Sequence, residues 1–216
     1  MKLYKRGSTG QMVREIQKAL HLMPDGIFGS MTEAAVKDFQ RSVHLIADGI
    51  VGPATLVKLI PVRLRKSKRV ITDIIIHCTA SQPCTDLSAD DIRRMHKAQG
   101  WSDIGYHYVV RLDGTVEEGR DVDIIGAHVS GFNKHSIGVV YVGGMDMQRR
   151  PKDTRTENQK NALLLLLMDL RKLYPNARIR GHRDFSPDKN GNGVVEPIEW
   201  IKQCPCFDAA AEFRRV

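Results

Sequence analysis

Two histidines and a pair of cysteines have the residue types of a metal site. His77 ends the apolar stretch VITDIIIH, and His182 follows ARIRG in the same way. A thiolate from KQCPCFD, either Cys204 or Cys206, would complete a set of two imidazoles and one sulfur. Such a set suits Zn²⁺ and leaves a fourth position for water, whose pKa zinc lowers to about 7. These residues are far apart in the sequence, so only the fold can bring them together as ligands. The alternative for each histidine is that it binds no metal and is simply packed in the core or exposed to solvent.

A second group of oxygen-bearing residues lies between His182 and these cysteines. The stretch DKNGNGVVEPIE, residues 188–199, matches the EF-hand calcium-loop pattern D-x-[DN]-x-[DN]-G-x5-E. The expected calcium ligands are Asp188, Asn190, Asn192, the Val194 carbonyl and Glu199. The alternative is an Asn/Gly-rich surface turn that resembles a calcium loop by chance. Our hypothesis is that Ca²⁺ orders this segment so that Lys202 and Cys204 reach the zinc site.

The net charge of the chain indicates which kinds of molecule it can bind. The 216 residues carry a formal net charge of +8, which implies attraction to a polyanion such as nucleic acid, anionic lipid or a cell-wall polymer. Only 6% of residues are aromatic, and no stretch interleaves aromatic side chains with Arg or Lys as a stacking platform requires. We therefore expect no nucleic-acid partner. The longest apolar run, residues 162–168, is far shorter than the roughly 18 residues of a membrane span, so we expect none.

Strand patterns recur through residues 70–216. VITDIIIH and SIGVVYVGG read as strands buried on both faces, YHYVVRLDGTVEEGR as a hairpin around Asp113-Gly114, and ARIRGH as a further strand. Alternation of these strands with helices predicts an α/β domain in which a mixed β-sheet is flanked by helices. Ligands gather beyond strand ends in open α/β sheets, so His77 and His182 are expected there.

The helices of this region have clear start signals. SADDIRRMHKAQG begins with a capping box from Ser88 to Asp91. A second box, from Thr156 to Gln159, precedes a long helix that carries the run ALLLLLM. We expect this run to be the buried face of that helix.

Residues 3–60 contain an internal repeat. DGIFGSMT at 25–32 and DGIVGPAT at 48–55 both fit D-G-I-x-G-x-x-T, with a turn at Asp-Gly and a tight entry to a helix at the second Gly. Ser30 and Glu33 form a capping box pattern. Helices are expected at about 9–22, 31–42 and 53–60. Their apolar positions predict a small three-helix domain.

The segment PVRLRKSKR, residues 61–69, follows this domain and carries five Arg or Lys in nine positions. Like charges repel one another and keep a chain solvated, which is typical of a linker. Contact of this linker with an anionic wall is the other interpretation.

The doubled motif resembles the peptidoglycan-binding module found on many cell-wall hydrolases. The resemblance covers nearly all of residues 3–60. It implies that residues 1–60 are a wall-binding domain whose partner is bacterial peptidoglycan. A three-helix bundle with another use is the alternative.

Four blocks of the larger region carry a second resemblance. They are IIIHCTAS, DIRRMHKAQGWSDIGYHYVVRLDGTVEEGRD, HSIGVVYVGG and the pair GHRD and KQCPCFD. In this order they resemble the zinc-dependent N-acetylmuramoyl-L-alanine amidases, the group shared by short phage lysozymes and peptidoglycan recognition proteins. The match runs from about residue 71 to 213, which implies that residues 70–216 are a catalytic domain. The insertion at 188–199 departs from the shorter phage enzymes.

The resemblance implies roles for particular residues. Three of them hold Zn²⁺: His77, His182 and Cys204. Tyr106 and Lys202 face the scissile amide, where a phenol and an ammonium can stabilise an oxyanion and help proton transfer. His128, in GAHVSG, matches a groove position near the metal, so it is expected either to contact substrate or to have a structural role.

The function implied is cleavage of the amide bond between N-acetylmuramic acid and the L-alanine of the stem peptide. A chain of this kind that starts MKLYKRGSTG, without a secretory signal, is expected to be a phage endolysin. It would be made in the host cytoplasm and act on the wall after release, as a monomer. The rival interpretation is a peptidoglycan-recognition protein that binds without cutting, although such proteins usually lack the metal cysteine.

Overall fold

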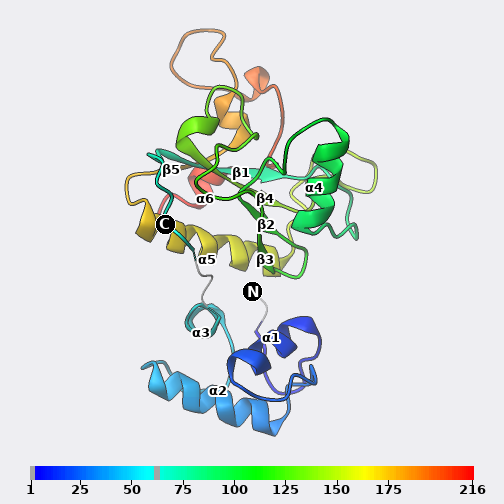
Figure 1. The fold of residues 1–216 in the computed structure, drawn as a ribbon, viewed down its shortest axis with the longest axis vertical. Helices are drawn as coiled ribbons and strands as arrows, with labels where there is room; N and C mark the ends of the chain where they lie inside the picture. The colour runs from blue at the N-terminus through cyan, green and yellow to red at the C-terminus, as the bar shows by residue number, and fades with distance from the viewer. Residues whose placement is uncertain (1–2, 61–63) are drawn as a thin grey trace. The chain divides into compact units, whose positions relative to one another are not determined.

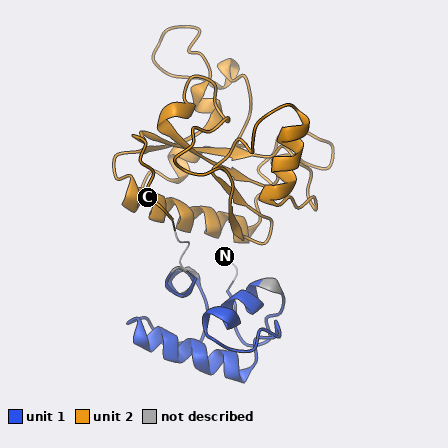
Figure 2. Cartoon of the chain, in the orientation of Figure 1, with its two compact units in different colours: residues 1–63 blue, residues 64–216 orange. Residues whose placement is uncertain are grey.

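The computed structural model describes residues 3–60 and 64–216, and the chain divides into two units, Met1–Arg63 and Leu64–Val216 (Figure 2). The first unit is helical, as expected. Its helices are α1 (Gln11–Ala19), α2 (Ser30–Ser42) and α3 (Pro53–Leu59). Within the described ranges, no helix has both the length and the apolar character needed to cross a bilayer.

The second unit is built on a five-stranded mixed sheet in the order β3-β2-β4-β1-β5 (Figure 1). Its strands are β1 (Asp73–Cys78), β2 (Tyr108–Val110), β3 (Val116–Glu118), β4 (Ser136–Tyr141) and β5 (Arg178–Gly181). The β2–β3 pair is antiparallel and the other pairs are parallel, which confirms the expected mixed sheet. The α-helices are α4 (Ala89–Ala98), α5 (Glu157–Leu173) and α6 (Ala209–Glu212), and the 3-10 helices are η1 (Asn133–His135), η2 (His182–Phe185) and η3 (Pro197–Glu199).

Helices α5 and α4 cover opposite faces of this sheet, and the side chains of β4 point alternately to the two faces. Val139 and Tyr141 pack in the cluster that holds the buried leucines of α5, whereas Val140 packs with Ile92 of α4. His77 is the register partner of Val140 on the neighbouring parallel strand. Paired side chains point to the same face, so His77 lies on the α4 face of the sheet.

The capping boxes decide where the helices of this unit begin. Ser88 accepts the N–H of Asp91 at the start of α4, and Thr156 accepts that of Gln159 at α5, which confirms both predictions. The prediction at Ser30 is wrong. Gly29 is the N-cap of α2, in an extended conformation, and Ser30 is already the first helical residue.

Each copy of the repeated motif in the first unit is closed around one buried glutamine, which the sequence analysis did not single out. The side-chain carbonyl of Gln40 accepts the N–H of Gly49 at 2.9 Å. Its Nε2 lies within 3.0 Å of three acceptors: Asp48 Oδ1, the Ile50 carbonyl and Thr55 Oγ1. Gln17 makes the same four contacts with the equivalent residues of the first copy. The conserved spacing of the two copies therefore places four partners around one amide.

Gln40→Leu is expected to lower the free energy of unfolding of the first unit by about 2–4 kcal/mol. Leucine has a similar volume but leaves the buried Gly49 N–H without its partner, and an unsatisfied buried group costs about 1–3 kcal/mol. Urea unfolding of the full chain, followed by circular dichroism, measures the change. Gln99→Leu, at an exposed position, is the control. Equal curves for the two variants would contradict the prediction.

The basic segment differs from the solvated linker expected at 61–69. Residues 61–63 lie outside the described part of the chain, but residues 64–69 pack on the second unit. Ser67 is only 6% exposed, and its backbone N–H donates to the Tyr174 hydroxyl at 2.6 Å. Hydrogen bonds and ion pairs with this unit overcome the mutual repulsion of the basic side chains.

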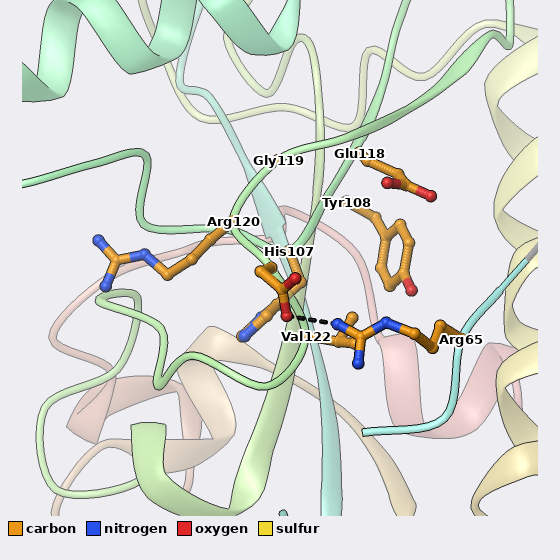
Figure 3. A pocket seen from close by; sticks show the side chains of 8 residues that line it. Arg65, His107, Tyr108, Glu118, Gly119, Arg120 and Val122 are labelled. Carbon is orange, nitrogen blue, oxygen red and sulfur yellow. Dashed lines mark hydrogen bonds and ion pairs between the residues drawn. The ribbon is translucent and has the colours of Figure 1, made fainter. Parts of the chain in front are cut away.

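The anchor of this segment is a pair of aspartates. Arg65 forms ion pairs with Asp121 and Asp123, beside a pocket that His107 also lines (Figure 3). The N–H of Lys68 donates to Asp123 at 2.6 Å. This hydrogen bond and the Arg65 guanidinium lower the pKa of Asp123 to about 2.

Asp123→Ala is expected to speed tryptic cleavage within residues 64–69 several-fold at neutral pH, because the segment loses its acceptor for Lys68 and one partner of Arg65. Asp90→Ala, which breaks an exposed ion pair within α4, is the control.

The same anchor should depend on pH. The pKa of Asp123 in the folded protein is depressed, so the stability that its carboxylate contributes is present above about pH 4 and is lost as the pH falls toward 2. The protection factor of the Lys68 amide, measured by NMR hydrogen exchange and corrected for the intrinsic rate at each pH, should fall between pH 5 and 2. Unchanged cleavage and exchange would mean that Asp123 does not anchor the segment.

Candidate metal centre

The two histidines meet because their strands are parallel neighbours. Ile76 of β1 is the register partner of Gly181 of β5, so the next positions are His77 and His182. His182 opens η2 directly after β5, and its Nδ1 lies 3.1 Å from His77 Nδ1. His77 is 1% exposed and His182 is partly exposed, so the pair opens to solvent on the His182 side.

Cys204 reaches the same point from a separate segment. Its Sγ lies 3.9 Å from His77 Nδ1 and accepts the N–H of Cys78 at 3.2 Å. The Tyr141 hydroxyl donates to the carbonyl of Pro205, and the N–H of Arg183 donates to the carbonyl of Cys204. Strand β4 and the first turn of η2 therefore hold the cysteine beside the histidines.

Cys206, the alternative that the sequence left open, points elsewhere. Its Sγ donates to the Gly144 carbonyl at 3.2 Å and lies 3.9 Å from Cys78 Sγ. The contact with Cys78, together with burial, raises the pKa of the Cys206 thiol. Cys206 is therefore a packed thiol, and the structure brings Cys204, not Cys206, to the histidines.

The three donor atoms fit a tetrahedral zinc ion. His77, His182 and Cys204 each offer one ligand atom, and these atoms lie within 4.8 Å of one another. Bonds of about 2.0–2.3 Å in a tetrahedron separate ligand atoms by about 3.3–3.7 Å. His77 Nδ1 lies 3.1 Å from His182 Nδ1 and 3.9 Å from Cys204 Sγ, and these two separations bracket that range. Two nitrogens and one sulfur are also the donor set that zinc prefers, with one position left open.

The electrostatics of the site keep the imidazoles neutral. Burial lowers the pKa of His77 well below its ordinary value, and the neighbouring histidines add to this effect. Burial and the positive charge of Lys202 lower the pKa of His182 to about 4. Both rings are therefore uncharged at pH 7, the form that binds a metal ion.

Tyr106 and Lys202 both lie at this centre. The Tyr106 ring is 5.1 Å from the His77 ring, and burial raises the pKa of the phenol, so the hydroxyl stays protonated at neutral pH. Lys202 is exposed, and its positive charge contributes to the lowered pKa values of both His77 and His182. His96, to which the sequence analysis gave no chemistry, lies 5.6 Å from the Tyr106 ring, centroid to centroid, and stacks on Trp101.

His128 does not lie in an open groove as expected for a substrate contact. It is 9% exposed, and its Nδ1 lies 3.0 Å from His77 Nε2, on the side of that ring away from His182 and Cys204. The imidazole of His77 therefore separates His128 from His182 and Cys204.

The insertion at 188–199 folds around its own side-chain oxygens. The Asp188 carboxylate accepts the N–H groups of Gly191 and Gly193, each at 2.7 Å. Asn190 and Asn192 each accept the N–H two residues further along the chain. The Glu199 carboxylate accepts three backbone N–H groups, from Lys189, Asn190 and Glu196. The expected calcium ligands other than Val194 thus organise one loop.

Comparison with models of known protein families shows which family the chain belongs to. The N-acetylmuramoyl-L-alanine amidase model matches residues 67–194. The chain belongs to the N-acetylmuramoyl-L-alanine amidase family. A second model, for a peptidoglycan binding domain, matches residues 9–59 in the first unit. The amidase match contains His77 and His182 but ends before Cys204, so the cysteine is assigned by geometry.

Relatives of this family include phage proteins named endolysin. The chain is 41% identical over 137 residues to the endolysin of Klebsiella phage KP32, an alignment that covers 63% of this chain and 82% of that protein. It is 38% identical over 147 residues to the endolysin of Escherichia phage T7, covering 68% and 88%. Among solved structures, an endolysin N-acetylmuramoyl-L-alanine amidase of Clostridium intestinale matches with a TM-score of 0.51 and 25% identity, over 70% of this chain and 89% of that one.

Proposed function

We propose that the protein is a zinc-dependent peptidoglycan hydrolase that cleaves the amide bond between N-acetylmuramic acid and the L-alanine of the stem peptide, as a phage endolysin. The observation that carries the proposal is the convergence of His77, His182 and Cys204 in a chain of the amidase family. The endolysin names of the phage relatives support the role in lysis and the bacterial wall as the place of action.

In this proposal the side chains around the scissile amide have separate catalytic roles. Zn²⁺ held by the three ligands supplies Lewis acidity, which polarises a carbonyl and makes water a nucleophile near neutral pH. Tyr106 donates a hydrogen bond to the amide oxygen as it becomes negative, because its raised pKa keeps the phenol protonated. Lys202 adds positive charge beside the same oxygen and can supply the proton that the leaving alanine nitrogen takes up.

The first unit would keep the enzyme on its substrate. Residues 1–60 are proposed as the wall-binding domain, because the peptidoglycan binding model matches 9–59. The formal net charge of +8 favours association with an anionic wall. Such a tether raises the local substrate concentration for residues 70–216, the proposed catalytic domain.

Mass spectrometry of purified peptidoglycan after digestion tests the proposed function. Free stem peptides that begin with L-alanine, together with glycan strands without peptide, would establish the amidase. New reducing sugar ends would mean a glycosidase. An unchanged sacculus, with zinc bound to the protein, would support the recognition protein that binds without cutting.

We also propose that Ca²⁺ binds the loop at 188–199. The support is the complete match to the calcium-loop pattern and the gathering of carboxylates from both ends of the loop, Asp188 and Glu199. Calcium would hold the insertion in the arrangement from which the chain continues to Lys202 and Cys204.

Calcium is expected to raise the melting temperature by about 5–10 °C when its free concentration is about 100-fold above the dissociation constant, because it binds only the ordered loop. Asp188→Asn removes one ligand charge and should reduce this shift, whereas Asp90→Asn, an exposed change on α4, should leave it unchanged. Differential scanning calorimetry with calcium and with magnesium measures the effect. A protein with no shift in calcium, while zinc remains bound, would rule out the proposed loop site.

A further inference from the structure

A line of hydrogen-bonding groups runs from His77 away from its metal-binding nitrogen. His77 Nε2 lies 3.0 Å from His128 Nδ1. His128 Nε2 lies 3.3 Å from the hydroxyl of Ser136, and that hydroxyl lies 2.9 Å from the carbonyl of Phe132. His128 and Ser136 are both buried, so water does not compete freely for these contacts.

The direction of each hydrogen bond follows from the last acceptor. The Phe132 carbonyl can only accept, so the Ser136 hydroxyl donates to it and its oxygen accepts the hydrogen of His128 Nε2. Neutral His128 then has no hydrogen on Nδ1, which accepts the hydrogen of His77 Nε2. His77 is left with an unprotonated Nδ1, and this is the atom that lies 3.1 Å from His182 Nδ1 and 3.9 Å from Cys204 Sγ.

Two glycines fix the place of the His128 ring. A Cβ atom added at Gly126 or at Gly138 would lie 2.6 Å from His128 Cδ2, a distance too short for any real contact. The backbone N–H of His128 is also held, by the side-chain oxygen of Asn133 at 2.9 Å. The ring therefore lies against bare backbone, in one position relative to His77.

We propose that His128 is a positioning residue for the metal centre: it holds His77 in the tautomer and orientation that turn Nδ1 toward His182 and Cys204. The inference rests on the proposed zinc site but concerns a residue outside the ligand set. The outer hydrogen-bond partner of a metal-binding histidine typically changes metal affinity by about 10–100-fold. Sequence reasoning could not assign this role, because the partners are 51 residues apart along the chain.

A matched pair of variants in the full chain separates this role from packing. Asparagine at 128 keeps an acceptor at the position of Nδ1, whereas leucine has a similar size and no acceptor. His128→Leu is expected to lower zinc affinity about 10–100-fold, measured by competition with a chromophoric chelator, and His128→Asn to stay within about threefold of the unchanged protein. The metal-free melting temperatures of the two variants should not follow this order, because leucine suits a buried site at least as well.

A long-range ¹H–¹⁵N NMR spectrum of the imidazoles gives a second readout that does not depend on either variant. It should show the hydrogen of His77 on Nε2 with and without zinc. Ser136→Ala removes the acceptor for His128 Nε2 and should lower zinc affinity several-fold while the protein stays folded. Equal zinc affinity for the leucine and asparagine variants, or a hydrogen on His77 Nδ1, would overturn the inference. Failure of the unchanged protein to bind zinc would instead overturn the proposed function.

Discussion

Cys204→Ser is expected to abolish zinc binding, and Cys206→Ser is expected to leave it intact. A serine hydroxyl is not ionised at neutral pH and is a poor replacement for a thiolate ligand. Removal of one of three protein ligands should reduce zinc affinity by at least a thousandfold, because a structural or catalytic site depends on each of its few bonds. Amidase activity should fall to background with the metal.

The comparison between the two cysteines gives this prediction its control. They are two residues apart, so both serine variants disturb the same segment. Cys206 Sγ donates to the Gly144 carbonyl, and a serine hydroxyl can make a similar hydrogen bond. Metal analysis of the purified variants measures zinc per chain. Zinc retained by Cys204→Ser and lost from Cys206→Ser would show that the assignment of the ligand is wrong.

Tyr106→Phe and Lys202→Met are each expected to reduce the rate of amide cleavage by about 10²–10³ while zinc remains bound. Removal of one donor to a developing oxyanion typically has an effect of this size. Phenylalanine keeps the ring that packs beside His77 and removes only the hydroxyl. Methionine keeps the length of Lys202 and removes its charge. Because both groups act on the same oxygen, the double variant should lose less than the product of the two single effects.

Turnover of a soluble muropeptide, measured with zinc content on the same samples, tests these rates. Tyr108→Phe and Lys97→Met make the same chemical changes on β2 and α4 and are the controls. The Lys202 variant should also raise the pKa of His182, since the Lys202 charge contributes to its depression. Full activity in either single variant would remove that residue from the proposed mechanism.

The candidate site was only partly accessible to sequence reasoning. His77 and His182 could be found from the sequence because each follows a predicted strand. The apolar pattern of a buried strand lies within a few consecutive residues, so it can be recognised without the tertiary structure. The choice between Cys204 and Cys206 was not local. It depends on the Tyr141 hydroxyl and the Arg183 N–H, which hold the segment from two other elements.

Three features that the local sequence patterns did not determine share one physical cause. Ser67 was expected in a solvated linker, but Tyr174 binds it from 107 residues away. His128 was expected either to contact substrate or to have a structural role, and it hydrogen bonds to His77. Gln40 was not singled out from the sequence, although it closes the second copy of the repeat. In each case the deciding partner belongs to a segment that the local pattern does not contain.

The sequence by itself determined the elements of this protein: the strands, the capped helices α4 and α5, the doubled motif of the first unit and the residue types of a zinc site. These features depend on hydrogen bonds and periodicities within a few residues. The tertiary structure alone decided which sulfur joins His77 and His182, and why His77 presents Nδ1. Those outcomes depend on contacts between parallel strands and distant loops, because a buried polar group takes its partner from whatever segment the fold brings beside it.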